Sequence, residues 1–276
     1  MTGKTPSALT PTHQRALRRA SAFLEDADFA AKLAEYAGQS VNRLMRTMPR
    51  PLSGGLNKAV EKAVLNCLNL AIHTLGHTPR RPSSRATAVL AGVSGGVSGF
   101  VGLAALPVEL PLTTALILRA IAEIARHHGE DLSRLEARLA CVEVLGLGSS
   151  RQRGQAGLGY YATRTLLGRL VGDASARLAE RGLANASAPV MGGLAAEIAP
   201  RFGLVVSERA AASALPVIGA LGGATVNFLF MKHFQQVAHG HFTVRRLERG
   251  YGENLIRREY ERLSAGSRET RAISAR

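Results

Sequence analysis

Tryptophan is absent from this sequence of 276 residues, and the other aromatic residues are few, with five tyrosines and eight phenylalanines. An all-β protein usually contains more aromatic and β-branched residues than this. Alanine, leucine, arginine and glycine are abundant instead, which suits helices that pack closely through small side chains. The length and the 46% share of hydrophobic residues allow a substantial core. The composition therefore predicts an all-α fold and excludes disorder throughout.

Cysteine is nearly absent as well. Cys67 and Cys141 each lie inside an apolar run, as buried small side chains do in a reducing compartment, and they do not suggest a disulfide framework. The first twenty residues show no apolar stretch after their charges, so we do not expect a secretory signal. These features predict a cytoplasmic protein.

Acidic residues are scarce relative to basic ones, with 20 Asp and Glu against 35 Lys and Arg and a net charge of +15. Such a charge attracts polyanions, which include nucleic acid, anionic lipid headgroups and acidic proteins. The sequence has no recognised nucleic-acid-binding motif and few aromatic residues for stacking on bases. We therefore expect no sequence-specific nucleic-acid binding, and favour an anionic membrane surface or a membrane protein complex as the partner.

Two long uncharged runs stand out, at residues 86–108 and 210–231, and each is long enough to span a bilayer. Both are rich in glycine, which lets a neighbouring helix approach closely. Both also contain Ala-Leu-Pro-Val, at 105–108 and 214–217. We interpret them as two glycine-rich apolar hairpins. Either an internal duplication makes residues 90–128 and 203–240 equivalent, or similar composition alone produces the match.

The order of these segments predicts a helical bundle with a single domain. A flexible tail is expected at 1–12, followed by one domain at 13–276 with N-terminal helices at 13–80, core hairpins at 86–148 and 203–244, and a charged C-terminal helix at 245–276. Within the first hairpin, Asp131 or Ser133 is expected to cap a helix.

Three segments carry a resemblance to a known family: residues 106–132, residues 136–148 with the sequence EARLACVEVLGLG, and residues 201–252. The amino-acid sequences of these segments and their order along the chain resemble the EcsC protein family. The resemblance implies an association with membranes, because that family is named for a gene beside an ABC exporter, and it implies no settled biochemical activity. The Pro-led apolar hairpins are also similar to the helical membrane-associated domain of some bacterial GTPases. Neither resemblance supplies a catalytic residue.

Isolated acids in apolar surroundings are the main candidates for chemistry, because a buried carboxylate must be paired, hydrogen-bonded or protonated. Such acids include Glu109, Glu123, Glu143, Glu197 and Glu208. We expect them to pair with nearby arginines in a structural network, the partners being Arg119, Arg126, Arg138 and Arg209. The alternative is a general acid or base, or an ion-handling group at membrane depth.

Glu109 is held between Pro107 and Pro111, which restrict the backbone around it. We expect it either to cap a helix that begins near Thr113 or to bind an arginine such as Arg119. The spacing of Arg119 and Glu123 also predicts an ion pair across one helical turn.

The leading interpretation is a non-enzymatic, membrane-associated accessory or interaction protein at the inner face of the membrane. The sequence contains neither HExxH nor Cys-x-x-Cys, so we expect no resident metal and no cofactor. The alternative is a peptidase-like or metal-dependent hydrolase, whose candidate residues are Glu109, Glu123, Glu143, His233 and His241.

Overall fold

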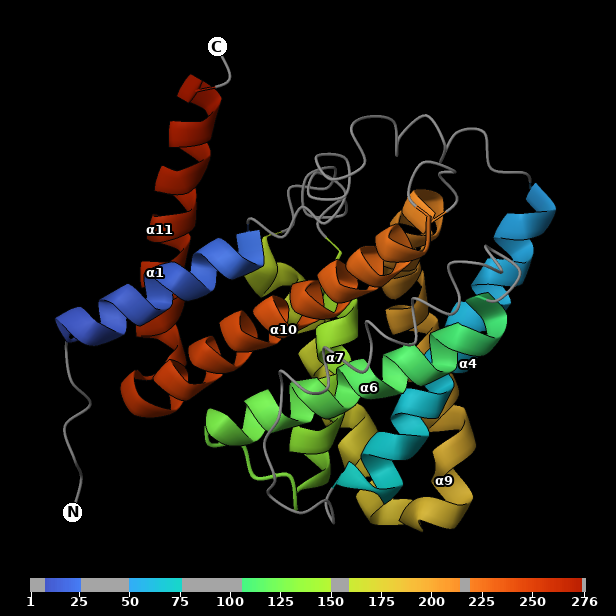
Figure 1. Cartoon of the computed structure of the whole chain (residues 1–276). Coiled ribbons are helices and arrows are strands. Elements are labelled where there is room, and N and C mark those ends of the chain that lie inside the picture. Colours follow the sequence, from blue (N-terminus) through green and yellow to red (C-terminus); the bar gives the residue numbers. More distant parts are fainter. Residues whose placement is uncertain (1–7, 26–49, 76–105, 150–158, 214–218, 275–276) are drawn as a thin grey trace.

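The computed structural model describes residues 8–25, 50–75, 106–149, 159–213 and 219–274, which are almost entirely helical and contain no strand (Figure 1). The predicted all-α fold is confirmed. The helices are α1 (Pro11–Glu25), α4 (Arg50–His73), α6 (Leu106–His127), α7 (Leu135–Leu147), α9 (Tyr160–Ser213), α10 (Gly219–Tyr251) and α11 (Glu253–Ser274).

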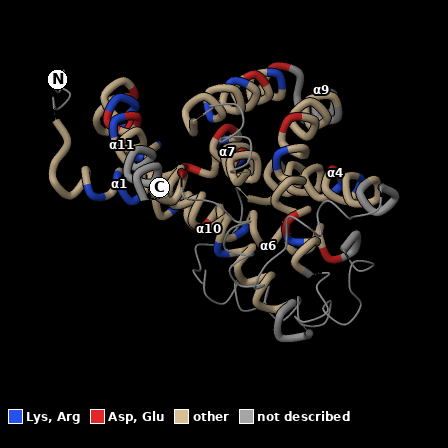
Figure 2. Tube along the Cα trace, turned by 90° about the horizontal axis from the view of Figure 1, so that it is seen from above, with Lys and Arg blue, Asp and Glu red and all other residues tan. Residues whose placement is uncertain are grey.

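The helices form two layers. In the first layer α1, α10 and α6 lie side by side, and α1 and α6 both contact α10. Figure 2 shows α7 and α9 on the other side of α10, and α4 beside α9. α4 contacts α6, α7 and α9, so it closes the bundle at one end. α11 contacts α1 and α10 at the opposite end.

α7 forms the centre of the core, because nearly every side chain from Ala137 to Leu147 is buried. A helix that is apolar all round must be enclosed by its neighbours. At two glycines a neighbouring side chain occupies the space that a Cβ would need. A Cβ on Gly148 would lie 2.4 Å from Phe234, and a Cβ on Gly240 would lie 2.7 Å from Leu24, where α1 crosses α10.

Two helix starts differ from the sequence predictions. α6 begins at Leu106 and not near Thr113. Pro107 fits in the first turn because the N–H groups there have no helical partner. α7 begins at Leu135, and its N-cap residue Arg134 makes no side-chain cap. The prediction of a cap from Asp131 or Ser133 was therefore wrong.

The predicted boundary at residue 245 was also wrong, because α10 continues through Arg245 to Tyr251. Val244, Leu247 and Tyr251 are buried and extend the apolar stripe of α10, so the helix has no reason to end earlier. The break comes at Gly252, whose φ of 84° is in the left-handed region that favours glycine. The charged C-terminal helix is α11.

The second uncharged run is divided between the end of α9 and the start of α10. Residues 86–105 lie outside the described residues, so the equivalence of 90–128 and 203–240 stays a prediction. Within the described helices, Pro189–Ala212 is the one stretch long and apolar enough to cross a membrane, judged by length and composition. It lies inside α9, which Figure 1 shows to be bent.

Candidate functional site

Glu109 forms a buried ion pair with Arg209, and their side chains are only 9% and 3% exposed. The Arg209 guanidinium also lies 5.0 Å from the centre of the Phe230 ring. Burial lowers the pKa of Arg209, and the charge of Glu109 opposes that shift. These contacts join the first turn of α6, the last turns of α9 and the middle of α10. The prediction that Glu109 binds an arginine is right, but the partner is Arg209 and not Arg119.

Glu123 pairs with Arg119 as predicted, at 3.8 Å across one helical turn, and the arginine is 62% exposed. Two other arginines expected as partners of these acids, Arg126 and Arg138, bind backbone carbonyl groups. Arg126 donates a hydrogen bond to the carbonyl oxygen of Leu75, and Arg138 donates one to that of Ile72. Both therefore satisfy carbonyl groups at the end of α4.

His233 is buried in α10, where its Nε2 donates a hydrogen bond to the carbonyl oxygen of Gly148, 2.8 Å away. This bond ties α10 to the residue that follows α7. The position of His233 is therefore explained by packing between two core helices.

Glu143 and His241 both lie near Tyr160, at the start of α9, and we call these three residues the buried polar cluster. The Tyr160 hydroxyl and His241 Nδ1 are hydrogen-bonded at 2.9 Å. Burial raises the pKa of Glu143 to about 7, opposed by Arg164 and Arg245. Burial also lowers the pKa of His241, and the same two arginines add to that effect. His241 is therefore neutral at physiological pH, while Glu143 titrates in that range.

Two atoms in this cluster have no hydrogen-bond partner among the described residues, namely Oε1 of Glu143 and Nε2 of His241. Their residues are only 2% and 0% exposed. Sequence reasoning selected both residues but missed Tyr160, which is hydrogen-bonded to His241 and lies near Glu143. A tyrosine pair at the start of a helix was the available signal, and such a pair is too common in helical proteins to indicate a polar cluster.

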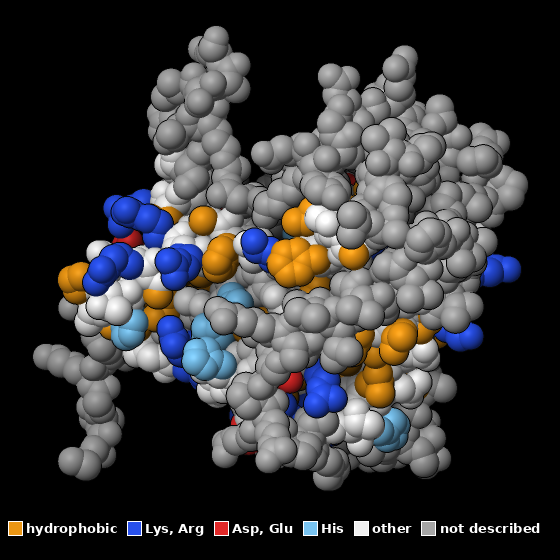
Figure 3. All heavy atoms as spheres, viewed as in Figure 1, with side chains coloured by type: hydrophobic (Ala, Val, Ile, Leu, Met, Phe, Trp, Pro, Cys, Tyr) orange, Lys and Arg blue, Asp and Glu red, His pale blue; other side chains and the backbone are white. Residues whose placement is uncertain are grey.

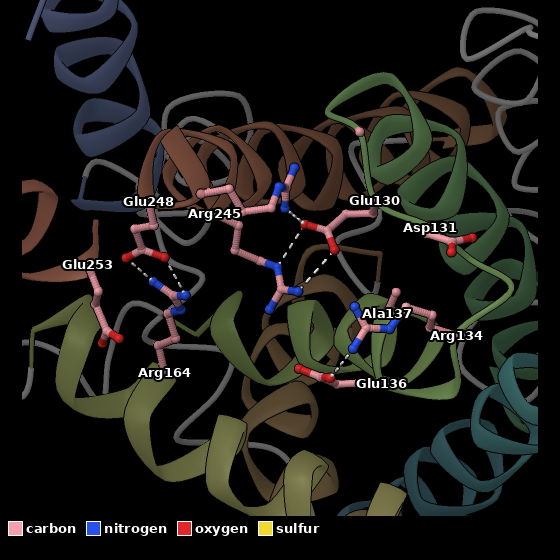
Figure 4. Close-up of a pocket in the computed structure, with 11 residues that line it drawn as sticks. Glu130, Asp131, Arg134, Glu136, Ala137, Arg164, Arg245, Glu248 and Glu253 are labelled. Atoms are coloured by element: carbon pink, nitrogen blue, oxygen red, sulfur yellow. Dashed lines mark hydrogen bonds and ion pairs between the residues drawn. The ribbon is translucent and has the colours of Figure 1, made fainter. Parts of the chain in front are cut away.

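Two arginines that shift the pKa values of this cluster, Arg164 and Arg245, form ion pairs that Figure 4 shows. Arg164 donates two hydrogen bonds of 2.6 Å to Glu248, which also accepts one from the Tyr161 hydroxyl. Arg245 donates two hydrogen bonds of 2.9 Å to Glu130, in the turn between α6 and α7. Each two-bond arginine–carboxylate pair fixes orientation as well as distance. The start of α9 and the turn before α7 are thus both locked to α10.

Arg249 reaches the same carboxylate, so Glu130 has two arginine partners. Burial opposes ionisation of Glu130, yet the hydrogen bonds from the two arginines hold its pKa below the usual value. The turn that presents Glu130 depends on Gly129, whose φ is 80°. Glycine is favoured there because other residues rarely adopt this conformation.

A polar pocket of about 430 Å³ opens over these pairs, and Figure 4 shows how its side chains lie. It is lined by Gly129, Glu130, Asp131, Arg134, Glu136, Ala137, Arg164, Arg245, Glu248, Arg249 and Glu253. Glu143 and His241 are not among these residues. A molecule in the pocket would therefore meet arginine–glutamate pairs and not the unpartnered acid and imidazole. Among the described residues no group of three His, Cys, Asp or Glu could hold a metal ion.

The outer layer of α1, α6 and α10 differs from the rest of the surface in its charge, and we call it the cationic layer. These three helices contain nine Arg or Lys and four Glu. No glutamate among the four is in the exposed class. Each has a partner: Glu25 accepts from Tyr260, Glu109 and Glu123 pair with arginines, and Glu248 pairs with Arg164.

The exposed cations of this layer are Arg15, Arg18, Arg19, Arg119, Lys232, Arg246 and Arg249. Exposed acids occur on other described elements, on α4, the α6–α7 turn, α7, α9 and α11. They are Glu61, Asp131, Glu136, Asp173, Glu180, Glu253 and Glu261. These other elements also carry exposed Lys and Arg, such as Lys58, Arg169 and Arg257, so their surface is mixed in charge. Among the described residues the exposed charges of the cationic layer are all positive.

Large apolar side chains are exposed in the same layer. Leu112 on α6 is 57% exposed and Phe228 on α10 is 44% exposed. Phe228, Lys232, His239 and Arg246 are separated by four, seven and seven residues, so they follow one face of α10. Figure 3 looks onto this side and shows Lys and Arg side chains over α1 and hydrophobic ones over α10 and α6.

The model of one protein family, the EcsC protein family, matches residues 14–247. No curated protein and no solved structure matches the chain. The matched range runs from α1 to near the end of α10. It therefore contains nearly all of the cationic layer and the whole buried polar cluster of Glu143, Tyr160 and His241.

Proposed function

The chain belongs to the EcsC protein family, and from that premise we propose that it is a non-enzymatic accessory protein that docks on an anionic membrane surface. The cationic layer is the observation that carries this proposal. Its exposed cations have no exposed acid beside them on the same helices, and Leu112 and Phe228 offer apolar contacts.

The physical case rests on the sum of weak attractions. Each Lys or Arg near an anionic bilayer contributes about 1 kcal/mol, within a Debye length of the surface. Exposed apolar side chains such as Phe228 add the hydrophobic effect where they reach the headgroup region. Several contributions of this size are enough for reversible peripheral binding. The anionic cytoplasmic leaflet is the surface that this charge fits, so we propose a cytoplasmic protein on the inner face of the membrane.

The buried pairs explain why the layer keeps its charge. Glu109 and Glu248 pair with Arg209 and Arg164, which are not among the exposed cations of the layer. Glu123 and Glu130 pair with two of the exposed cations, Arg119 and Arg249. The exposed cations outside any ion pair among the described residues are Arg15, Arg18, Arg19, Lys232 and Arg246. The separation concerns the acids: among the described residues, exposed Asp and Glu occur on the other elements and not on α1, α6 or α10. The separation makes one orientation on a membrane favourable, with α4, α9 and α11 turned toward the cytoplasm.

Vesicle co-sedimentation with two matched variants tests the proposal. Arg18→Gln/Arg19→Gln removes two exposed charges from α1, and Arg169→Gln/Arg177→Gln removes two from the exposed side of α9. Net charge is equal in both variants. On vesicles containing phosphatidylglycerol, the α1 variant should bind about 30-fold more weakly than the parent, since two charges contribute about 2 kcal/mol.

The α9 variant should bind as the parent does, and raising the salt concentration should weaken both. Equal losses in the two variants would mean that net charge alone attracts the protein. No binding of the parent to anionic vesicles would refute the membrane role.

A hydrolase stays the alternative, and one observation favours it: Glu143 and His241 offer unpartnered buried atoms beside Tyr160. Buried acids with raised pKa values are common in active sites. Glu143→Gln tests this, because an acid–base enzyme would lose its activity while its fold is kept.

A further inference from the structure

Three histidines meet where the end of α6 approaches the middle of α10. His127 and His128 are consecutive, and their ring centres are 5.5 Å apart. His128 Nε2 and His239 Nδ1 are 3.3 Å apart, in a hydrogen bond between the two rings. No contact described for the core or for the pocket uses these imidazoles, and His239 lies on the same face of α10 as Lys232 and Arg246.

The charged groups around the cluster are mainly cations. Arg246 is exposed and has no ion-pair partner among the described residues. Arg249 is occupied, because it donates to the His128 carbonyl oxygen and to Glu130. Glu130, the nearby acid, is itself held by Arg249 and by Arg245. Where α1 crosses α10 at Gly240, it contributes apolar contacts.

One atom of the cluster indicates a missing partner. His128 is 7% exposed, and its Nδ1 is buried without a hydrogen bond among the described residues. A buried polar atom without a partner costs free energy unless a bound group satisfies it. Burial, together with the charges of Arg246, His239, His127 and Arg249, lowers the pKa of His128 to about 4. The cluster is therefore a place of positive potential with an unused nitrogen.

We propose that His127, His128, His239 and Arg246 form a binding site for a doubly charged phosphate group. Its acceptor oxygens suit imidazole N–H and guanidinium donors, and its charge offsets the mutual repulsion of the cluster. The group can be a phosphomonoester headgroup of a lipid or a free phosphate. The lipid source rests on the proposed docking of the cationic layer, whereas the site itself does not.

Proton uptake follows from this geometry. In the neutral His128–His239 pair each ring carries one N–H, and one of these is used in the hydrogen bond between the rings. One of the two outer ring nitrogens therefore has no hydrogen to donate to an anion. Protonation of the pair supplies that hydrogen. A dianion stabilises the protonated pair and raises its pKa. By reciprocity, protonation must strengthen binding of the dianion. Affinity should therefore increase as the pH falls from 7 to 5, by at most about tenfold per pH unit for each proton taken up.

The first experiment uses sulfate, which stays a dianion throughout this pH range, in buffers with EDTA to remove metal ions. Imidazole proton signals are followed by NMR at each pH. The parent protein should show saturable shifts in histidine signals, with tighter binding at pH 5.5 than at pH 7. His239→Gln and His128→Gln should lose the saturable shifts, and thermal unfolding checks that each variant is folded.

His73→Gln is the matched control, because His73 is an exposed histidine at the end of α4, outside the cluster. It should keep the saturable shifts of the cluster. Parent protein that shows no saturable sulfate effect at any pH would overturn the site. So would an effect that survives in His239→Gln and His128→Gln.

The second experiment distinguishes a phosphate group on a lipid from a free phosphate. Vesicles of phosphatidylcholine contain either phosphatidic acid, a phosphomonoester, or phosphatidylglycerol, a phosphodiester, at equal surface charge. If the parent protein binds phosphatidic acid vesicles more tightly and His239→Gln does not, the phosphate group belongs to a lipid. If the parent binds sulfate but shows no such preference, the ligand is a free phosphate. If the parent binds sulfate but no vesicle, the proposed membrane role fails while the site stands.

Discussion

Removal of the Glu109 carboxylate should destabilise the protein strongly. Glu109→Gln leaves Arg209 buried, at 3% exposure, without its counter-ion. Breaking a buried ion pair from one side typically costs about 3–5 kcal/mol, because the remaining buried charge has lost its counter-ion and is shielded from water. The amide oxygen that this substitution introduces can accept one hydrogen bond, and the Phe230 ring stays over the guanidinium. We therefore expect a loss of stability at the lower end of this range, about 3 kcal/mol.

For a chain of this size, 1 kcal/mol shifts the melting temperature by about 2–4 °C. Glu109→Gln should therefore lower it by about 6–12 °C, measured by circular dichroism at 222 nm. Glu123→Gln is the matched control on the same helix. Its pair with Arg119 is long and exposed, so the cost should stay below about 1 kcal/mol.

A second-site variant identifies the cause. Arg209→Met in the Glu109→Gln background removes the buried charge that has lost this carboxylate and should restore most of the lost stability. A melting temperature of Glu109→Gln equal to that of the parent would refute this reasoning. Unchanged stability together with lost vesicle binding would instead give Glu109 a functional role. A double variant as unstable as the single one would show that packing, and not charge, explains the loss.

Three further predictions concern the polar cluster and the helix contacts. The folded-state pKa of Glu143, about 7, lies above its unfolded value, so the free energy of unfolding should fall as the pH rises from 5 to 8. Glu143→Gln should remove about 3 kcal/mol of this decline in urea titrations at several pH values, and an unchanged profile would contradict the shift. Tyr160→Phe should cost about 1 kcal/mol by loss of the hydrogen bond to His241, and a neutral effect in the same titration would argue against that bond. Gly240→Ala should lower the melting temperature because its Cβ would clash with α1, whereas Gly250→Ala, with no atom within 4 Å, should leave it unchanged or slightly raised.

Features that depend on nearby residues could be predicted from the sequence. The Arg119–Glu123 pair follows from helical spacing, and the all-α fold follows from composition and the family resemblance. The need of Glu109 for an arginine also follows, because a buried acid requires a partner. The identity of that arginine does not, since Arg209 lies 100 residues further along the chain and only the tertiary arrangement brings the start of α6 near the end of α9.

The buried polar cluster also depends on contacts between distant parts of the chain, which the sequence does not reveal. Glu143 and His241 could be selected as isolated polar residues in apolar runs, but Tyr160, which bonds to His241 and lies near Glu143, comes from a third helix. The end of α10 was misplaced for another reason. Charge density increases at Arg245, yet the buried face of the helix continues to Tyr251, and burial decides where the helix ends.

The central claim, that the cationic layer faces the membrane, can be tested with one fluorescence measurement. Cys67 and Cys141 are buried, so a cysteine introduced at the surface can be labelled selectively with an environment-sensitive dye. Phe228 and Leu166 are equally exposed, at 44%, the first in the cationic layer and the second on α9. With anionic vesicles, the dye on Phe228→Cys should shift to shorter wavelength and the dye on Leu166→Cys should not. A shift at residue 166 alone, or equal shifts at both positions, would contradict the account.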